Sequence, residues 1–133
     1  MRQFHLQIAT PDGLVFDGQA IGLLVRTDGG DIEILAGHED YFATLGTGRA
    51  KLTTEEGSKE AAASGGFLSV RGGEVMAVFT TFEFSDAISM ERAKKAKEKA
   101  EEILRNHTDK KELSVAEAKL KRAINRINIA KNN

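Results

Sequence analysis

The chain has 133 residues, 41% of them hydrophobic, and a formal net charge of −1. This length suits one domain or a small domain with an appendage, and the balanced charge gives no sign of a nucleic-acid or membrane partner. The absence of cysteine excludes disulfides, thiolate catalysis and cysteine-ligated metal sites, and no segment approaches the roughly 20 apolar residues that span a bilayer. Residues 1–5 show no signal or transit peptide, so we expect the chain to stay in the compartment where it is made.

Composition changes abruptly near Asp86. All 13 glycines lie between Gly13 and Gly73. Residues 1–86 contain six Lys and Arg against 13 Asp and Glu, whereas residues 87–133 contain 13 against seven, so the two parts carry net charges of −7 and +6. We therefore predict two domains, residues 1–86 and residues 87–133.

The first part has the pattern of short β-strands. Residues 4–8 alternate apolar and polar side chains, as a half-buried strand does, and Pro11-Asp12-Gly13 is typical of a tight turn. Further strands are expected at residues 14–17, 20–27, 32–35, 41–45, 48–54, 59–63, 67–71, 75–80 and 82–84. About ten short strands separated by glycine-rich turns, with no helical pattern between them, predict an antiparallel β-sandwich.

The second part predicts a two-helix antiparallel hairpin. We expect a first helix over residues 88–105, capped by Ser85 or Asp86, and a second that opens at the capping box Ser114–Glu117. The apolar positions, spaced by three and four, are Ala93, Ala96, Ala100, Ile103 and Leu104 in the first helix and Ala116, Leu120, Ala123, Ile124, Ile127 and Ala130 in the second. An alanine seam buries little apolar area, which contributes roughly 25 cal/mol per Å². Both a docked hairpin and one that detaches fit this pattern.

No constellation of residues predicts catalysis. His5, His38 and His107 fall in different predicted elements without metal-ligand spacing. The glycine pairs at residues 65–66 and 72–73 are not followed by the Lys-Ser/Thr of a phosphate loop. The sequence therefore predicts neither an enzyme nor a metal site.

Basic side chains recur at helical spacing in both predicted helices. Positions three or four residues apart project to one side of a helix, so such a row is either a solvated face or a site for an anion. The residues concerned are Arg92, Lys95 and Lys99 in the first helix and Lys119, Arg122 and Arg126 in the second.

Three segments carry a resemblance to a known family. Residues 35–45, with Gly37-His38 at their centre, resemble the "L-x-G-H-x-P-x-x-x-x-L" stretch of F-type ATP synthase epsilon subunits, although Asp40 stands where proline is usual. Residues 6–13 resemble the family's opening strand and "T-P" turn. Residues 65–67, together with residues 75–78, resemble its "G-G-F…V" hairpin.

This resemblance implies a non-catalytic subunit of the central stalk, with no required cofactor. Its sandwich would contact the gamma subunit and the c-ring, and its helices would reach the alpha/beta catalytic head, drawn to an acidic segment of beta, and inhibit ATP hydrolysis. The complex would place the chain peripherally at the cytoplasmic face of the cell membrane; H⁺ and Na⁺ coupling are not distinguished. The residues expected in loops that face the c-ring are Asp28, Asp31, His38, Glu39, Asp40 and Tyr41.

Some bacterial members of this family bind ATP as a regulatory ligand through an I/L-D-x-x-R-A motif. Here the motif reads Ile88-Ser89-Met90-Glu91-Arg92-Ala93, with serine in place of the aspartate. The resemblance therefore leaves ATP open as a ligand, with weaker affinity than in relatives that have the complete motif. The implied ATP-binding residues are Glu83, Ile88, Ser89, Arg92, Ala93, Arg122 and Arg126.

A different class of protein is the alternative: a free-standing β-sandwich module whose basic helical hairpin binds nucleic acid. The +6 charge of the hairpin favours it, because neutralising phosphates drives such binding. The predicted hairpin contains no aromatic residue, so it cannot stack on bases.

Overall fold

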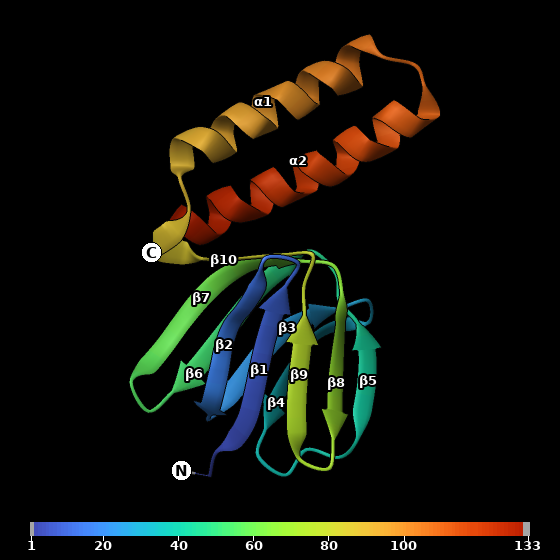
Figure 1. Ribbon diagram of the computed structural model, residues 1–133. Coiled ribbons are helices and arrows are strands. Elements are labelled where there is room, and N and C mark those ends of the chain that lie inside the picture. The colour runs from blue at the N-terminus through green and yellow to red at the C-terminus, as the bar shows by residue number, and fades with distance from the viewer. Residues whose placement is uncertain (1, 132–133) are drawn as a thin grey trace. The chain divides into compact units, whose positions relative to one another are not determined.

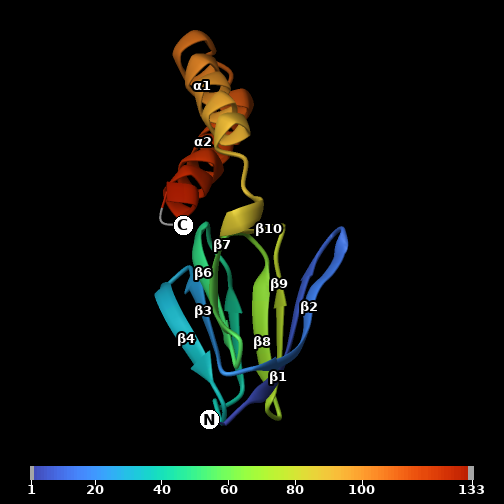
Figure 2. The same ribbon diagram turned by 90° about the vertical axis from the view of Figure 1, so that its left-hand side faces the viewer.

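The computed structural model describes residues 2–131 (Figures 1 and 2). The elements in chain order are β1 (Phe4–Thr10), β2 (Gly13–Ala20), β3 (Gly22–Thr27), β4 (Gly30–Leu35), β5 (Tyr41–Thr44), β6 (Gly48–Thr54), β7 (Gly57–Ser64), β8 (Phe67–Arg71), β9 (Glu74–Val78), β10 (Thr81–Phe84), the 3₁₀ helix η1 (Ser85–Ala87), α1 (Met90–Asn106) and α2 (Lys110–Lys131).

The chain divides into two compact units, Met1–Phe84 and Ser85–Asn133. In the first unit, two five-stranded sheets lie face to face (Figure 2). Sheet A has the order β2-β1-β9-β8-β5, and sheet B has the order β10-β7-β6-β3-β4. The second unit is a pair of antiparallel helices (Figure 1). The predicted fold class, a β-sandwich followed by a helical hairpin, is confirmed.

The core of the sandwich consists of side chains from alternate strand positions. Along β1, for example, Phe4, Leu6 and Ile8 are buried while His5 and Gln7 face outward. This alternation follows from the two-residue repeat of a strand, which sends successive side chains to opposite faces of the sheet. Sheet B contributes Leu23 and Val25 to the same cluster.

Strand β1 joins two parts of sheet A that are distant in the sequence. It pairs antiparallel with β2 through the Pro11-containing turn, and it pairs parallel with β9, where Leu6 lies opposite Val75. The other strand pairings of the sandwich are antiparallel. The predicted strand over residues 20–27 is wrong at its start, because the chain leaves sheet A at Ala20 and enters sheet B at Gly22.

The Gly65-Gly66 pair makes a turn that other residues could not make. Both glycines have positive φ, and a Cβ on Gly66 would lie 1.8 Å from the carbonyl oxygen of Val78. Glycine is therefore required where the chain turns from β7 to β8.

Both helices begin at residues other than those predicted. The N-cap of α1 is Ser89, whose Oγ accepts a hydrogen bond of 3.2 Å from the Arg92 amide; Ser85 and Asp86 lie in η1 instead. Helix α2 begins four residues before Ser114, because Asp109 Oδ1 accepts hydrogen bonds from the amides of Lys111 and Glu112 at 2.8 and 3.3 Å.

The seam between the helices is rich in alanine, as expected, but two predicted members lie outside it. Ala96 and Ile124 are exposed. The buried residues of the hairpin are Ala93, Ala100, Ala116, Ala123, Ile127 and Ile129. Four of these six side chains are single methyl groups, so the two helices bury little apolar area against each other.

Candidate interaction surfaces

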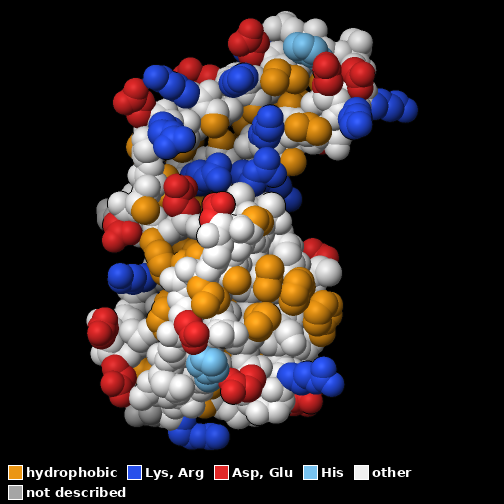
Figure 3. All heavy atoms as spheres, viewed as in Figure 1, with side chains coloured by type: hydrophobic (Ala, Val, Ile, Leu, Met, Phe, Trp, Pro, Cys, Tyr) orange, Lys and Arg blue, Asp and Glu red, His pale blue; other side chains and the backbone are white. Residues whose placement is uncertain are grey.

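The outer face of sheet A exposes an unusual number of large apolar side chains. Leu14, Phe42, Phe67 and Met76 form what we call the apolar face, and their exposed fractions are 61%, 66%, 36% and 41%. Figure 3 shows apolar side chains gathered on this side of the sandwich. Contiguous apolar surface of this kind is typical of a site for another protein.

Strand register explains why these side chains share a face. Phe42 of β5 lies opposite Ser69 of β8, and Ser69 lies opposite Met76 of β9. Directly opposed residues of neighbouring strands point to the same side. The rings of Phe42 and Phe67 stack with centroids 5.6 Å apart. This face is not evident from the sequence, because the pairing of β5 with β8 and of β8 with β9 decides which residues come together.

The outer face of sheet B is charged instead. Arg26 in β3 forms a hydrogen-bonded ion pair with Asp31 in β4, and this hydrogen bond lowers the pKa of the Asp31 carboxyl. Arg49 Nη1 in β6 lies 3.7 Å from Glu60 Oε2 in β7. Charged residues are depleted from the cores of protein interfaces, so the two outer faces differ in their suitability for docking.

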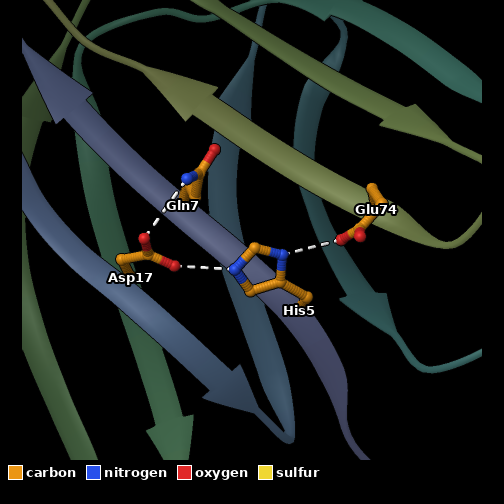
Figure 4. Close-up of polar contacts among 4 residues, drawn as sticks. All are labelled: His5, Gln7, Asp17 and Glu74. Atoms are coloured by element: carbon orange, nitrogen blue, oxygen red, sulfur yellow. Dashed lines mark hydrogen bonds and ion pairs between the residues drawn. The ribbon is translucent and has the colours of Figure 1, made fainter.

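A polar cluster occupies the end of sheet A where β9 begins (Figure 4). His5 Nε2 lies 2.6 Å from Asp17 Oδ1, and His5 Nδ1 lies 2.8 Å from Glu74 Oε2. The hydrogen bond with Asp17 first, and that with Glu74 second, raise the pKa of His5. No pattern in the sequence groups these residues. The alternation of β1 turns His5 outward, but its two partners lie 12 and 69 positions away.

The residues predicted to face the c-ring do not form one surface. Asp28 lies in the turn before β4, whereas His38, Glu39 and Asp40 lie in the connection after it. The two groups therefore lie at opposite ends of β4. Asp31 was expected in a loop and lies in a strand instead, whereas Tyr41 lies in the strand that was predicted over residues 41–45. Asp31 pairs with Arg26 in the β3–β4 ladder and Tyr41 pairs with Val70 in the β5–β8 ladder.

Asp40 has a structural role at the position where the family pattern has proline. Its Oδ1 accepts a hydrogen bond of 2.9 Å from the amide of Gly72. This bond ties the β4–β5 connection to the β8–β9 turn. His38 packs edge-on against the Tyr41 ring at 5.7 Å, so the same connection is ordered by contacts on both sides of Glu39.

The residues of the predicted nucleotide motif fall in both units. Ile88, Ser89, Arg92 and Ala93 surround the start of α1. Arg122 and Arg126 lie in the C-terminal half of α2, which runs back toward the start of α1 (Figure 1). Glu83 belongs to β10 of the sandwich unit. Ser89 Oγ is already hydrogen-bonded to its own helix, and Ala93 is buried.

The basic rows of the hairpin remain accessible in part. Arg92, Lys95 and Lys99 are exposed on α1, and Lys95 Nζ pairs with Glu91 Oε1 at 3.2 Å. On α2, Lys119 is exposed and Arg122 is half-buried. Over residues 2–131, no group of three or more His, Asp or Glu is arranged to hold a metal ion. No helix of that part of the chain is long and apolar enough to cross a membrane.

Two family models together cover nearly the whole chain. Residues 3–85 match the model "ATP synthase, Delta/Epsilon chain, beta-sandwich domain". Residues 86–131 match the model "ATP synthase, Delta/Epsilon chain, long alpha-helix domain".

Curated relatives match along the full length. The ATP synthase epsilon chain of Bacillus pumilus (strain SAFR-032) is 39% identical over 130 residues, which cover 98% of each chain. That of Ruminococcus albus is 36% identical over 131 residues, with the same coverage.

Solved structures share the fold. A chain from the cryo-EM structure of the Euglena gracilis mitochondrial ATP synthase, OSCP/F1/c-ring in rotational state 1, superposes with a TM-score of 0.82 at 24% identity; the match covers 98% of this chain and 82% of that one. A chain from the central stalk/c-ring structure of the Tetrahymena thermophila mitochondrial ATP synthase has a TM-score of 0.70 at 12% identity, with 97% of each chain covered.

Proposed function

Because the chain belongs to the ATP synthase delta/epsilon chain family, a family of non-catalytic stalk subunits, we propose that its sandwich docks on the gamma subunit and its hairpin restrains ATP hydrolysis. Both halves of the chain match the family, which leaves no need for a nucleic-acid module. Within the complete enzyme the chain is peripheral, at the cytoplasmic face of the cell membrane, and ATP is a regulatory ligand rather than a required cofactor.

The apolar face of sheet A is the observation that carries the docking proposal. Phe42 and Met76 are exposed at 66% and 41% although they lie on a regular sheet. Burying apolar surface in a partner stabilises a complex by roughly 25 cal/mol per Å². The charged outer face of sheet B would instead have to desolvate ion pairs such as Arg26–Asp31. Gamma therefore docks on sheet A.

The test is binding of full-length variants to an ATP synthase complex from which this subunit has been removed. Phe42→Asp and Met76→Asp should each weaken binding by about tenfold or more, as expected for truncating a central interface contact. Leu35→Asp is the matched control, because Leu35 is 51% exposed at the end of β4 in sheet B. Equal losses for all three variants, each shown to be folded, would contradict docking through sheet A.

One end of the sandwich would face the c-ring. Asp28 and His38 lie at opposite ends of β4, so only one of them lies at the end that would face the ring. Cysteines placed at Asp28 and at His38 in separate full-length chains should therefore not both cross-link to the c subunit. Cross-links from both positions would contradict this orientation.

Two features of the hairpin support the proposed restraint of hydrolysis. Residues 87–133 carry a net charge of +6, which attracts the acidic segment expected on the beta subunit over about a Debye length, ~8 Å at physiological salt. The alanine seam buries little apolar area, so separating the two helices from each other loses little hydrophobic stabilisation.

The nucleotide proposal depends on the start of α1. The backbone amides at a helix N-terminus favour anions, and Arg92 is exposed there. Arg122 and Arg126 are suited to phosphate because a guanidinium donates two parallel hydrogen bonds. Serine at position 89 supplies no carboxylate, so ATP binding is expected to be weaker than in relatives with aspartate at this position.

A further inference from the structure

His5, Asp17 and Glu74, which we call the His5 cluster, occupy three neighbouring strands of sheet A (Figure 4). Asp17 lies in β2, His5 in β1 and Glu74 in β9. The cluster therefore spans both the β1–β2 hairpin and the parallel junction of that hairpin with β9. Its members lie on the outer side of sheet A, where Glu74 is two positions from Met76 along β9, but they are not among the four residues that define the apolar face. The proposed docking and inhibition do not depend on them.

The geometry requires a proton on each ring nitrogen of His5. Nε2 lies 2.6 Å from Asp17 Oδ1 and Nδ1 lies 2.8 Å from Glu74 Oε2. An ionised carboxylate only accepts hydrogen bonds, and a neutral imidazole donates through one nitrogen alone. Both contacts are hydrogen bonds only when His5 is an imidazolium. In its neutral form, one of the two would bring together two acceptors.

The charges around His5 are nearly all acidic. Strands β1, β2 and β9 contain no lysine or arginine. Arg71 of β8 is the register partner of Glu74, on the side away from His5. On the other side, Asp17 Oδ2 accepts a hydrogen bond of 3.3 Å from Gln7 Nε2, which fixes the carboxylate toward His5. The raised pKa of His5 agrees with this arrangement.

We propose that the His5 cluster is a proton-operated clamp that holds the β1–β2 hairpin against β9. The pKa of His5 is raised above its ordinary value of 6.5, so the clamp contributes its full stability below that pH. Its contribution is lost as the pH rises through the raised value in the folded protein. Above that range the edge of sheet A opens more often. Leu14 of the apolar face lies on the same hairpin, beside its turn and at the opposite end from His5.

Backbone amide exchange and histidine titration, both followed by NMR on the full chain, test the clamp. The His5 ring should titrate above 6.5 in the natural chain and at lower pH in the double variant Asp17→Asn, Glu74→Gln. In His5→Gln, amides of β1 and β2 should exchange faster than in the natural chain at pH values below neutrality. This excess should disappear above the pH at which the His5 ring of the natural chain is found to titrate.

Two controls separate the clamp from a general loss of structure. Amides of β4 in sheet B should show no excess exchange in His5→Gln. His107→Gln should leave β1 and β2 unchanged, although His107 Nε2 also lies near a carboxylate, 3.8 Å from Glu112 Oε2. An excess in His5→Gln that is the same at every pH would overturn the proposal. If a variant fails to fold, the natural chain still tests the proposal: titration of its His5 ring at or below pH 6.5 would by itself overturn the clamp.

Discussion

At the residue scale, Ser89 is a helix cap at a position that the proposed nucleotide site also uses. It is the N-cap of α1, since its Oγ accepts the hydrogen bond from the Arg92 amide. It also stands where the family's nucleotide motif has aspartate. Aspartate is an equally good N-cap, and its charge interacts favourably with a helix N-terminus. A cap effect and a ligand effect can therefore be distinguished by comparing Ser89→Ala with Ser89→Asp.

Ser89→Ala should destabilise the hairpin by about 1 kcal/mol, because the Arg92 amide loses its acceptor. Ser89→Asp should preserve the cap and raise ATP affinity by roughly ten- to a hundredfold, the value of a hydrogen bond to a charged group. Chemical denaturation followed by helical circular dichroism measures the first effect, and calorimetric titration with ATP measures the second.

Ser114→Ala is the matched control for the cap. Ser114 is an exposed residue inside α2, so its replacement by a better helix former should leave stability unchanged or slightly higher. If Ser89→Asp binds ATP no better than the natural chain, position 89 is not an anchor for the nucleotide. If neither form binds ATP, the arginines are better interpreted as contacts to the beta or gamma subunit.

At the element scale, the hairpin depends on close approach of the two helices at alanines. Ala123 is fully buried in α2, whereas Ala96 is exposed in α1. Ala123→Leu inserts three carbons into a packed seam and should destabilise the hairpin by roughly 1–3 kcal/mol. Ala96→Leu makes the same chemical change at the surface and should have little effect. Helical circular dichroism during urea unfolding checks both, and equal destabilisation by the two variants would show that the seam is placed wrongly.

Some of these elements could be predicted from the sequence, and others could not. Alternation and glycine turns were sufficient for the sandwich, because each strand pattern is local. The starts of the helices were wrong because several residues near each start can serve as caps. Ser85 and Asp86 became part of η1, which left the cap of α1 to Ser89, and Asp109 preceded Ser114 as the cap of α2.

The surfaces were harder to predict than the elements. The apolar face and the His5 cluster both depend on which strands become neighbours. His5 and Glu74 meet only because β1 pairs with β9, a pairing between residues 69 positions apart. No periodicity within either strand encodes that choice. The residues expected to face the c-ring fall into two groups, because a strand of six residues, β4, separates Asp28 from His38.

At the scale of the whole molecule, the two units should be separable in function. The sandwich unit, Met1–Phe84, has its own core. A chain truncated after Asp86 should therefore still bind gamma, while the reconstituted enzyme should hydrolyse ATP faster than with the full chain. Steady-state ATPase assays and co-purification with gamma measure the two outcomes.

A variant with fewer positive charges tests whether the basic residues of α2 contribute to the inhibition of ATP hydrolysis. Neutralising Arg122 and Arg126 together should produce part of the increase in hydrolysis, and the difference from the natural chain should shrink as salt rises, because salt screens exposed charges. Hydrolysis unchanged in both the truncated chain and the charge variant would leave the hairpin without a regulatory role. A folded truncation that fails to bind gamma would contradict the assignment of docking to the sandwich.

The strand order of sheet A also dictates when this sheet can assemble. Its central strand, β9, is the last of its five strands in the sequence. Until residues 74–78 have been synthesised, β2-β1 on one side and β8-β5 on the other have no common neighbour. Sheet B, by contrast, already contains the hairpins β3–β4 and β6–β7, which close short loops. Distant pairings form more slowly than local ones. On a ribosome-bound chain, the β1–β2 hairpin would therefore wait without its neighbour β9 while four of the five strands of sheet B have already been synthesised.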